Sequence, residues 1–339
     1  MSKPYKVAIL VENELAHSIF RQKDLDFLGS FAEVNSIDAL PETISTEFMT
    51  EQLQGAQACI TCWRTPSFTE EMLAQTPELR LIAHAAGAVR SLVPASFWTS
   101  GKHITSNAPV IAEDVSQTVL ALVLTSLKQM WAFSKYTAAG GWGGGEKGSF
   151  TTKRLDELNV GIVGCSLVGK EVIKILRPYR CNLSVWDPYL SPMEAEMLDV
   201  KQIASIDELI STSDVLTLHA PANPDCRHLL NANNIPLIRD GALVINTARG
   251  MLIDEAPFIK ELQKNRFFAC LDVTDPEPPA DDHPFLRMEN VILTPHIAGG
   301  HTMNGRHMLG RNSIKEVYNY LIKGLIAYEV RGEMLDHMA

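Results

Sequence analysis

Asn159-Val-Gly-Ile-Val-Gly-Cys-Ser-Leu-Val-Gly169 is the stretch that decides the fold, because it has the pattern of a buried strand, a tight turn and the first turn of a helix. We expect Gly164 to make the turn and Gly169 to let the helix pack closely on the strand. Ser166 stands where a glycine normally lets the backbone approach a pyrophosphate, so the fingerprint is G-x-S-x-x-G. An acid, Asp187, ends the next apolar run, and the combined pattern predicts a dinucleotide site.

Asp187 also predicts which dinucleotide binds. A carboxylate at this position can accept both hydroxyls of a ribose but repels a 2′-phosphate, which favours NAD over NADP. The structural alternative is an aspartate that caps a turn over Pro188 and Tyr189. Two interpretations of Ser166 are open: its hydroxyl donates to a phosphate oxygen, or it crowds the site.

Short apolar runs on both sides of this fingerprint predict two sets of parallel strands. The runs are nearly continuous and rich in β-branched residues, as in strands buried on both faces of a sheet. Five runs precede the fingerprint, at 7–11, 31–34, 56–62, 79–83 and 104–106. Six more begin with the run inside the fingerprint, at 160–163, 183–186, 215–218, 242–245, 268–273 and 291–293. The pattern predicts a doubly wound α/β fold. Residues 112–135 are expected to form one long helix and 304–326 a helical tail, whereas the glycine-rich stretch 140–145 is expected to be a loop packed through Trp142.

Composition limits the class of protein. The 339 residues are 46% apolar and 21% charged, which suits a folded protein of two domains, and a formal net charge of −10 argues against nucleic acid or an anionic membrane as a partner. The apolar run at 119–127 is well short of the roughly 20 residues that span a bilayer, and no export signal is recognised at the start. Six cysteines are scattered along the chain, which predicts a protein of the reducing cytoplasm. Cys59 and Cys62 have CxxC spacing but no second such pair, so no metal site is predicted there.

Polar residues at three later strand ends predict the chemistry. They lie in 246–250, 272–279 and 294–299, and the carboxyl ends of parallel strands face the ligand crevice of an open sheet. A guanidinium such as that of Arg249 can engage the carboxylate and carbonyl of a 2-keto acid with paired hydrogen bonds. Hydride delivery to that carbonyl requires a proton donor near neutral pH, for which His296 is suited, and Glu277 is the candidate carboxylate that orients the ring. Taken singly, each residue could instead be an ordinary surface or strand-end residue.

From about residue 56 to 330 the chain strongly resembles the D-isomer-specific 2-hydroxyacid dehydrogenase family. The matching segments are the nucleotide turn and residues 84–90, 214–221, 241–250, 272–278 and 294–299. The resemblance implies an NAD-binding Rossmann domain at 106–304, inserted into a flavodoxin-like substrate domain made of 1–105 and 305–339. It also implies a homodimer, and an NAD-dependent enzyme that interconverts a 2-keto acid and a D-2-hydroxy acid.

The resemblance assigns roles to individual residues. Arg249, Glu277 and His296 would be catalytic. The cofactor would contact Gly164, Ser166, Leu167, Val168, Gly169, Asp187, Ala220, Pro221, Thr247, Ala248, Arg249, Asp272 and His296. The substrate would contact Gly87, Ala88, Arg249 and His296. Arg90 could add a second positive charge, although a surface arginine is favoured.

A binding protein of the same fold is the alternative to an enzyme. Corepressors that share this fold sense NAD(H) and keep the same three polar residues, so the triad does not separate the two classes. The chain carries no long flanking interaction segment, which favours the enzyme. Formate dehydrogenases, also relatives, have glutamine where this chain has Glu277. The sequence does not identify the 2-hydroxy acid or the physiological direction.

Overall fold

The computed structural model describes residues 4–143 and 151–337, which form two compact units. One consists of Met1–Ile111 with Gly299–Met338, and the other of Ala112–Ala298. These boundaries differ from the expected 105/106 and 304/305. Val110 and Ile111 pack into the core of the first unit, and the aromatic ring of Trp63 in that unit lies against Gly300. The first unit therefore includes a few more residues at each boundary than expected.

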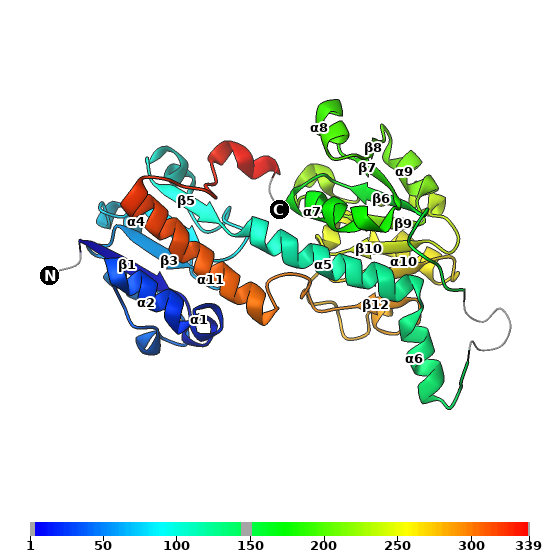
Figure 1. Cartoon of the computed structure of the whole chain (residues 1–339), viewed down its shortest axis with the longest axis horizontal. Coiled ribbons are helices and arrows are strands. Elements are labelled where there is room, and N and C mark those ends of the chain that lie inside the picture. The colour runs from blue at the N-terminus through cyan, green and yellow to red at the C-terminus, as the bar shows by residue number, and fades with distance from the viewer. Residues whose placement is uncertain (1–3, 144–150, 338–339) are drawn as a thin grey trace. The chain divides into compact units, whose positions relative to one another are not determined.

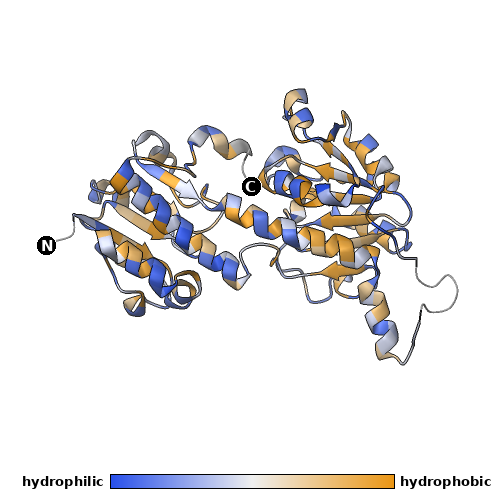
Figure 2. Cartoon of the chain, in the orientation of Figure 1, coloured by the Kyte–Doolittle hydropathy of each residue, from blue (hydrophilic) through white to orange (hydrophobic). Residues whose placement is uncertain are grey.

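The first unit is built on a five-stranded parallel sheet in the order β2-β1-β3-β4-β5. The strands are β1 (Tyr5–Leu10), β2 (Ala32–Val34), β3 (Ala58–Thr61), β4 (Leu81–His84) and β5 (His103–Ser106). All five were expected from their apolar runs, and the strand order is that of flavodoxin-like sheets. Figure 2 shows that most of the length of these strands has the colour of apolar residues.

Helices cover both faces of this sheet, and one of them comes from the C-terminal tail (Figure 1). The helices are α1 (Asn13–Ile19), α2 (Gln22–Phe31), α3 (Thr46–Leu53), α4 (Glu70–Gln75) and α11 (Met303–Tyr318). Helix α11 buries Leu309, Ile314 and Val317 against the core of this unit. A Cβ on Gly310 would lie 2.6 Å from the Ile19 backbone oxygen, so only glycine allows α11 to approach α1 this closely. The predicted tail helix is thus confirmed, and it completes the first unit.

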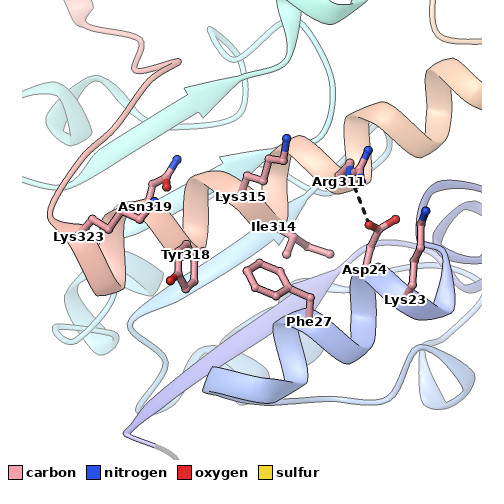
Figure 3. Close-up of a pocket in the computed structure, with 9 residues that line it drawn as sticks. All are labelled: Lys23, Asp24, Phe27, Arg311, Ile314, Lys315, Tyr318, Asn319 and Lys323. Carbon is pink, nitrogen blue, oxygen red and sulfur yellow. Dashed lines mark ion pairs between the residues drawn. The ribbon is translucent and has the colours of Figure 1, made fainter.

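Helices α2 and α11 leave a hollow of about 400 Å³ between them (Figure 3). Phe27 and Tyr318 both line it, with their rings 5.1 Å apart, and Arg311 lies 3.7 Å from the Asp24 carboxylate. Aromatic packing and one long ion pair therefore hold the two helices together here.

The second unit is built on a seven-stranded parallel sheet in the order β12-β11-β10-β9-β6-β7-β8. Its strands are β6 (Asn159–Val163), β7 (Asn182–Trp186), β8 (Lys201–Gln202), β9 (Val215–Leu218), β10 (Leu243–Asn246), β11 (Phe268–Leu271) and β12 (Val291–Leu293). Its helices are α5 (Ala108–Leu127), which begins in the first unit, α6 (Met130–Ala138), α7 (Leu167–Leu176), α8 (Pro192–Met197), α9 (Ile206–Thr212) and α10 (Glu255–Leu262). The chain reverses its direction of winding between β6 and β9, which is where doubly wound sheets bind ligands at the carboxyl ends of their strands.

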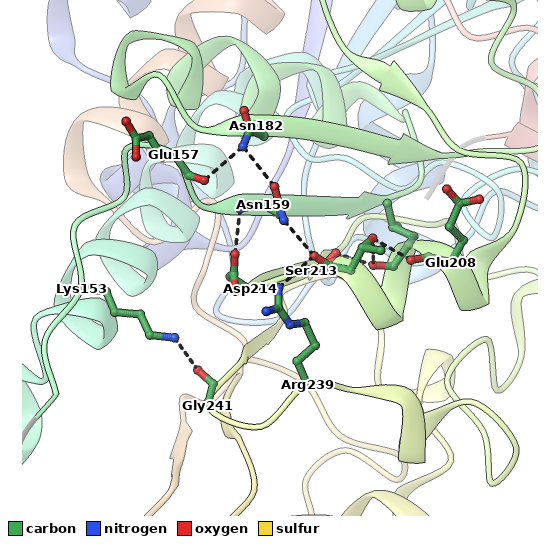
Figure 4. Close-up of polar contacts among 11 residues, drawn as sticks. Lys153, Glu157, Asn159, Asn182, Glu208, Ser213, Asp214, Arg239 and Gly241 are labelled. Atoms are coloured by element: carbon green, nitrogen blue, oxygen red, sulfur yellow. Dashed lines mark hydrogen bonds and ion pairs between the residues drawn. The ribbon is translucent and has the colours of Figure 1, made fainter.

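The opposite, amino-terminal edge of this sheet is closed by polar contacts (Figure 4). Asp214 accepts a hydrogen bond from the Asn159 backbone N–H at 3.0 Å and pairs with Arg239 at 3.1 Å. The Asn159 amide donates to the Thr212 carbonyl, and Asn182 donates to Asn159. These polar side chains are engaged in hydrogen bonds within the protein, which is consistent with a ligand site at the other edge of the sheet.

Two expectations, about α5 and about Trp142, need correction, and a third concerns residues outside those described. Residues 112–135 were expected to form one helix, but the chain breaks it between α5 and α6, where Gln129 takes a left-handed φ of 50°. Trp142 is 88% exposed and is not a packing anchor. The rest of the expected loop, from residue 144, lies outside the described residues.

By length and composition alone, α5 could cross a membrane, and it is the one helix with this property within 4–143 and 151–337. Helices in the cores of soluble proteins meet the same criterion, and α5 buries Val115, Val119 and Val123.

Candidate active site

The turn between β6 and α7 has the backbone geometry that the fingerprint predicted. Gly164 has a φ of +93°, and a Cβ there would lie 2.8 Å from backbone atoms of His219 and Ala220 at the end of β9. A Cβ on Gly169 would lie 2.3 Å from the Gly164 carbonyl oxygen. Both positions therefore require glycine, one for its conformation and the other for the close packing of α7 on the strand.

Ser166 caps α7 instead of standing free. Its Oγ accepts the Gly169 N–H at 3.4 Å and donates to the His219 carbonyl at 2.8 Å. The hydroxyl proton is thus engaged within the protein, so the structure does not direct it at a phosphate. The backbone N–H groups of Leu167 and Val168, in the first turn of α7, are the donors that a helix leaves unpaired at its amino terminus.

Asp187 follows β7 and holds two backbone segments. One carboxylate oxygen accepts the Cys165 N–H at 2.6 Å, and the other accepts the Tyr189 N–H at 2.7 Å. The turn over Pro188 and Tyr189, which was the structural alternative, is therefore present. Each oxygen keeps further acceptor capacity, so a ribose contact by Asp187 stays a prediction.

Arg249 lies just beyond β10, on a turn that Asn246 fixes. The Asn246 side chain donates to the Arg249 carbonyl at 2.8 Å and accepts the Ala248 N–H at 3.0 Å. Burial lowers the pKa of the Arg249 guanidinium from its usual value, and the Glu277 carboxylate opposes that shift. Across the described part of the chain, no carboxylate forms an ion pair with Arg249. The structure therefore presents a half-buried cation that still has capacity for an anion.

His296 and Glu277 form a hydrogen-bonded pair. His296 Nδ1 is 2.8 Å from Glu277 Oε1, and the two side chains are 48% and 39% exposed. His296 has a left-handed φ of 53°, and its N–H donates to the Asp272 carbonyl at 2.8 Å. Within the described residues, His296 Nε2 forms no hydrogen bond or ion pair.

Asp272 holds the segment that carries His296. Its carboxylate accepts hydrogen bonds from Thr294 Oγ1 at 2.5 Å, the Ile297 N–H at 2.9 Å and the Ala298 N–H at 2.8 Å. Asp272 is only 1% exposed, so these three donors define its role in the structure. The expected contact between Asp272 and the cofactor stays a prediction. Sequence reasoning missed this positioning role, because the partners of Asp272 are 22 to 26 residues away. It also missed that of Asn246, although the partners of Asn246 are only two and three residues away.

The remaining predicted contact residues lie in two places. Ala220 and Pro221 follow β9, and Thr247 and Ala248 follow β10, all at the carboxyl edge of the second sheet. Gly87 and Ala88 follow β4 in the first unit, where the Gly87 carbonyl accepts Ser106 Oγ at 2.6 Å. Arg90 donates to the Leu335 carbonyl, as a surface arginine would.

Among the residues that the structure describes, no group of three or more His, Cys, Asp and Glu side chains could hold a metal ion. Cys59 and Cys62 are buried as free thiols, and burial raises the pKa of Cys62 to about 12.

Comparison with known proteins agrees with this geometry. Residues 120–298 match the model for the NAD-binding domain of D-isomer specific 2-hydroxyacid dehydrogenases. The chain belongs to this family.

Individual relatives of this family are distant. A D-3-phosphoglycerate dehydrogenase from Methanocaldococcus jannaschii is 26% identical over 90% of the chain, which covers 57% of that protein. A hydroxypyruvate reductase from Thermotoga maritima is 25% identical over 75% of the chain and 81% of its own length. The crystal structure of a glyoxylate reductase from Paecilomyes thermophila has a TM-score of 0.77 at 22% identity, with 97% of this chain and 99% of that chain covered, and shows the shared fold. The chain thus spans only a little over half the length of the first of these relatives.

The second unit is the NAD-binding domain of this dehydrogenase family, and its residues fit NAD. Among its buried side-chain atoms, Thr247 Oγ1 and His219 Nδ1 have no hydrogen-bond partner, although burial of an unpaired polar atom is costly. His219 follows β9 beside the Gly164 turn, and Thr247 follows the neighbouring strand β10, so both residues lie at the carboxyl edge of the sheet, where the cofactor is predicted to bind. The glycine turn, the open first turn of α7 and these unpaired atoms would hold the dinucleotide. The cofactor prediction is thereby confirmed at the level of the domain.

Proposed function

We propose that this protein is an NAD-dependent oxidoreductase that interconverts a 2-keto acid and a D-2-hydroxy acid. The observation that carries the proposal is the pair formed by His296 Nδ1 and Glu277 Oε1 at 2.8 Å, next to an arginine that has no ion-pair partner within the described residues. A carboxyl-stabilised acid/base beside a desolvated guanidinium matches the two requirements of 2-keto acid reduction, a proton donor and an anion receptor.

Arg249 binds the carboxylate of the substrate in this proposal. A guanidinium offers paired donors in one plane, which suits a carboxylate beside a carbonyl. Desolvation strengthens its attraction for an anion, because neighbouring water no longer screens the charge. Glu277 lies close enough to influence Arg249, so the same carboxylate holds both groups of the site electrostatically.

His296 moves the proton. With Nδ1–H donated to Glu277, the neutral ring has a free lone pair on Nε2, and the protonated ring has a donor there. When bound, NADH would supply the hydride to the substrate carbon in reduction, and NAD⁺ would accept it in oxidation. In reduction, the His296 Nε2–H bond breaks as the carbonyl oxygen takes the proton, and Glu277 stabilises the imidazolium before transfer. In oxidation, neutral Nε2 takes the hydroxyl proton back.

Several finer features belong to this proposal. Gly87 and Ala88 contribute backbone groups to substrate binding, Asp187 selects NAD over NADP, and the protein is a cytoplasmic homodimer. Family membership and the names of the relatives support an acid substrate of small size.

A panel of 2-keto acids assayed for NADH oxidation, and repeated with NADPH, tests the proposal. We expect at least one acid to be reduced, NADH to be strongly preferred, and His296→Ala to lose the activity while it still binds NADH. If NADH binds and no 2-keto acid is reduced, the alternative of an NAD(H)-sensing binding protein replaces the enzyme. Equal turnover efficiency with both cofactors would contradict the role of Asp187.

A further inference from the structure

Glu255, the first residue of α10, contacts both ends of the loop that carries Glu277. Its Oε1 accepts the backbone N–H of Asp275 at 3.1 Å, and its Oε2 lies 3.0 Å from His283 Nε2. The two side chains are only 16% and 14% exposed, unlike the more exposed pair of His296 and Glu277. One carboxylate therefore fixes the loop two residues before Glu277 and six residues after it.

The hydrogen bonds of His283 determine which nitrogen carries its proton. Nδ1 accepts the Phe285 N–H at 3.3 Å, so in the neutral ring the proton is on Nε2, where it donates to Glu255. The His283 ring packs on Phe285 at 4.7 Å, and Phe285, 3% exposed, packs in turn on Phe258 of α10 at 6.3 Å. The far end of the loop is therefore anchored in the core.

We infer that Glu255 and His283 act as positioning residues that set Glu277 against His296. This inference deepens the proposed function and rests on it. The loop between the two anchors is largely exposed, so few packing contacts are available to place Glu277. Since a displacement of about 1 Å in a catalytic arrangement can cost up to about 10² in rate, the two anchors matter for the acid/base pair.

Few of the described charged groups surround the clamp, by which we mean Glu255 with its two partners Asp275 and His283. Arg227 pairs with the Asp275 carboxylate at 3.2 Å, Asp281 and Asp282 precede His283, and Arg249 acts on Glu277. None of them replaces Glu255 as the acceptor for the Asp275 N–H.

Glu255→Gln is the sharpest test because it keeps the size of the side chain. A carboxylate can accept from both Asp275 and His283, whereas an amide has one acceptor oxygen and turns donors toward the other partner. The matched control is Glu261→Gln on the same helix, which loses ion pairs with Lys264 and Arg266 but does not touch the loop. We expect Glu255→Gln to lower kcat by about tenfold to hundredfold, with NADH affinity within about twofold of wild type, and Glu261→Gln to leave both unchanged.

A double-mutant cycle separates positioning from general destabilisation. If Glu255 acts through Glu277, its substitution lowers kcat in the wild type but not in a Glu277→Gln background. Equal losses in both backgrounds would overturn the inference. His283→Gln, whose amide can still donate to Glu255, should retain more activity than His283→Ala.

An NMR titration of the His296 ring provides a readout that needs no turnover. The resonance is assigned by its loss in His296→Ala. We expect the titration midpoint in Glu255→Gln to move toward that of Glu277→Gln, and a midpoint equal to wild type would overturn the inference. If the wild-type protein reduces no 2-keto acid, the proposed function fails, and the clamp is then decided by this titration alone.

Discussion

In the proposed function, both the length and the planarity of the Arg249 side chain matter. Arg249→Lys keeps the positive charge but loses the paired donors of the planar guanidinium. A single ammonium group cannot reproduce both hydrogen bonds, so one substrate oxygen is left without a partner. We expect the variant to raise KM and lower kcat for every 2-keto acid that the protein reduces, with a combined loss in kcat/KM of about 10² or more, since charged hydrogen bonds contribute about 1.5–3 kcal/mol each. Steady-state kinetics on the best substrate checks this. A variant with near-wild-type kinetics would remove Arg249 from the site.

In the proposed function, Glu277 acts on His296 through its negative charge. Glu277→Gln removes the carboxylate that stabilises the imidazolium, so the ring loses its proton at lower pH. Reduction needs the protonated ring, so the falling limb of its pH profile should move to lower pH. Oxidation needs the neutral ring, so its rising limb should move in the same direction. Both profiles are measured under conditions in which chemistry limits the rate.

The control for this prediction is His296→Ala, which removes the acid/base itself. Such a loss typically costs about 10² to 10⁴ in rate at every pH, whereas Glu277→Gln mainly moves the limbs. Superimposed profiles for Glu277→Gln and wild type would show that His296 works without Glu277.

The residue types of this site could be predicted from sequence, but their supports could not. Arg249, Glu277 and His296 follow strand ends, and that placement is visible in the alternation of apolar runs and polar segments. Glu255 gives no such signal, because it lies at the start of a helix and its partners, Asp275 and His283, are 20 and 28 residues away. Long-range hydrogen bonds of this kind have no local pattern.

At the scale of elements, Ser166 connects helix α7 to strand β9. Ser166→Ala removes the helix cap and the hydrogen bond to the His219 carbonyl, so we expect it to lower the free energy of unfolding by about 1–2 kcal/mol. Because the hydroxyl is engaged within the protein, NADH affinity should change by less than about threefold, a shift of under 1 kcal/mol. Urea unfolding and a fluorescence titration with NADH measure the two quantities.

Ser205→Ala is the matched control for this substitution. Ser205 caps α9 in the same domain by accepting the Asp207 N–H at 3.2 Å, so its loss should destabilise the fold by a similar amount without any effect on NADH. A large loss of NADH affinity in Ser166→Ala alone would show that this hydroxyl turns to a phosphate when the cofactor binds.

The elements themselves were predictable wherever burial on both faces imposed a pattern. Strand β9 coincides with its apolar run, because every residue of a central parallel strand needs an apolar or well-paired side chain. Strand β8 was missed since Lys201 and Gln202 are exposed at the edge and carry no such pattern. The break between α5 and α6 was missed as well, because Gln129 takes its left-handed conformation with neither glycine nor proline beside it.

At the scale of the whole molecule, each unit has its own sheet, its own core and, among the residues that the structure describes, one deeply buried histidine. In the first unit, His84 pairs with Thr61 Oγ1 at 2.9 Å, and in the second, His219 pairs with Thr217 Oγ1 at 2.9 Å. Burial lowers the pKa of His84 to about 4 and that of His219 to about 3. Both rings are therefore neutral in the folded protein across the physiological range.

These two histidines should make each unit less stable in acid. An unfolded histidine binds a proton near pH 6.5, and the folded ones do not, so the unfolded state gains protons as the pH falls and stability decreases. The loss starts near pH 6.5 and continues to about pH 4 for His84 and about pH 3 for His219. From about pH 7.5 to about pH 5.5, each histidine should lower the stability of its unit by about 1.4 kcal/mol.

Separate substitutions can assign this acid sensitivity to one unit at a time. His84→Asn keeps an acceptor or donor near the Nδ1 position, and His219→Gln keeps one near the Nε2 position, so each retains its threonine partner without a titrating ring. We expect His84→Asn to flatten the pH dependence for β3 and β4 only, and His219→Gln for β9 and β10 only. Amide hydrogen exchange at the two pH values, corrected for the intrinsic rate, measures each sheet separately. His301→Gln, at an exposed histidine, should change neither. If either buried-histidine variant flattened the pH dependence in both sheets equally, the two units would have to unfold as a single cooperative body, in spite of their separate sheets and cores.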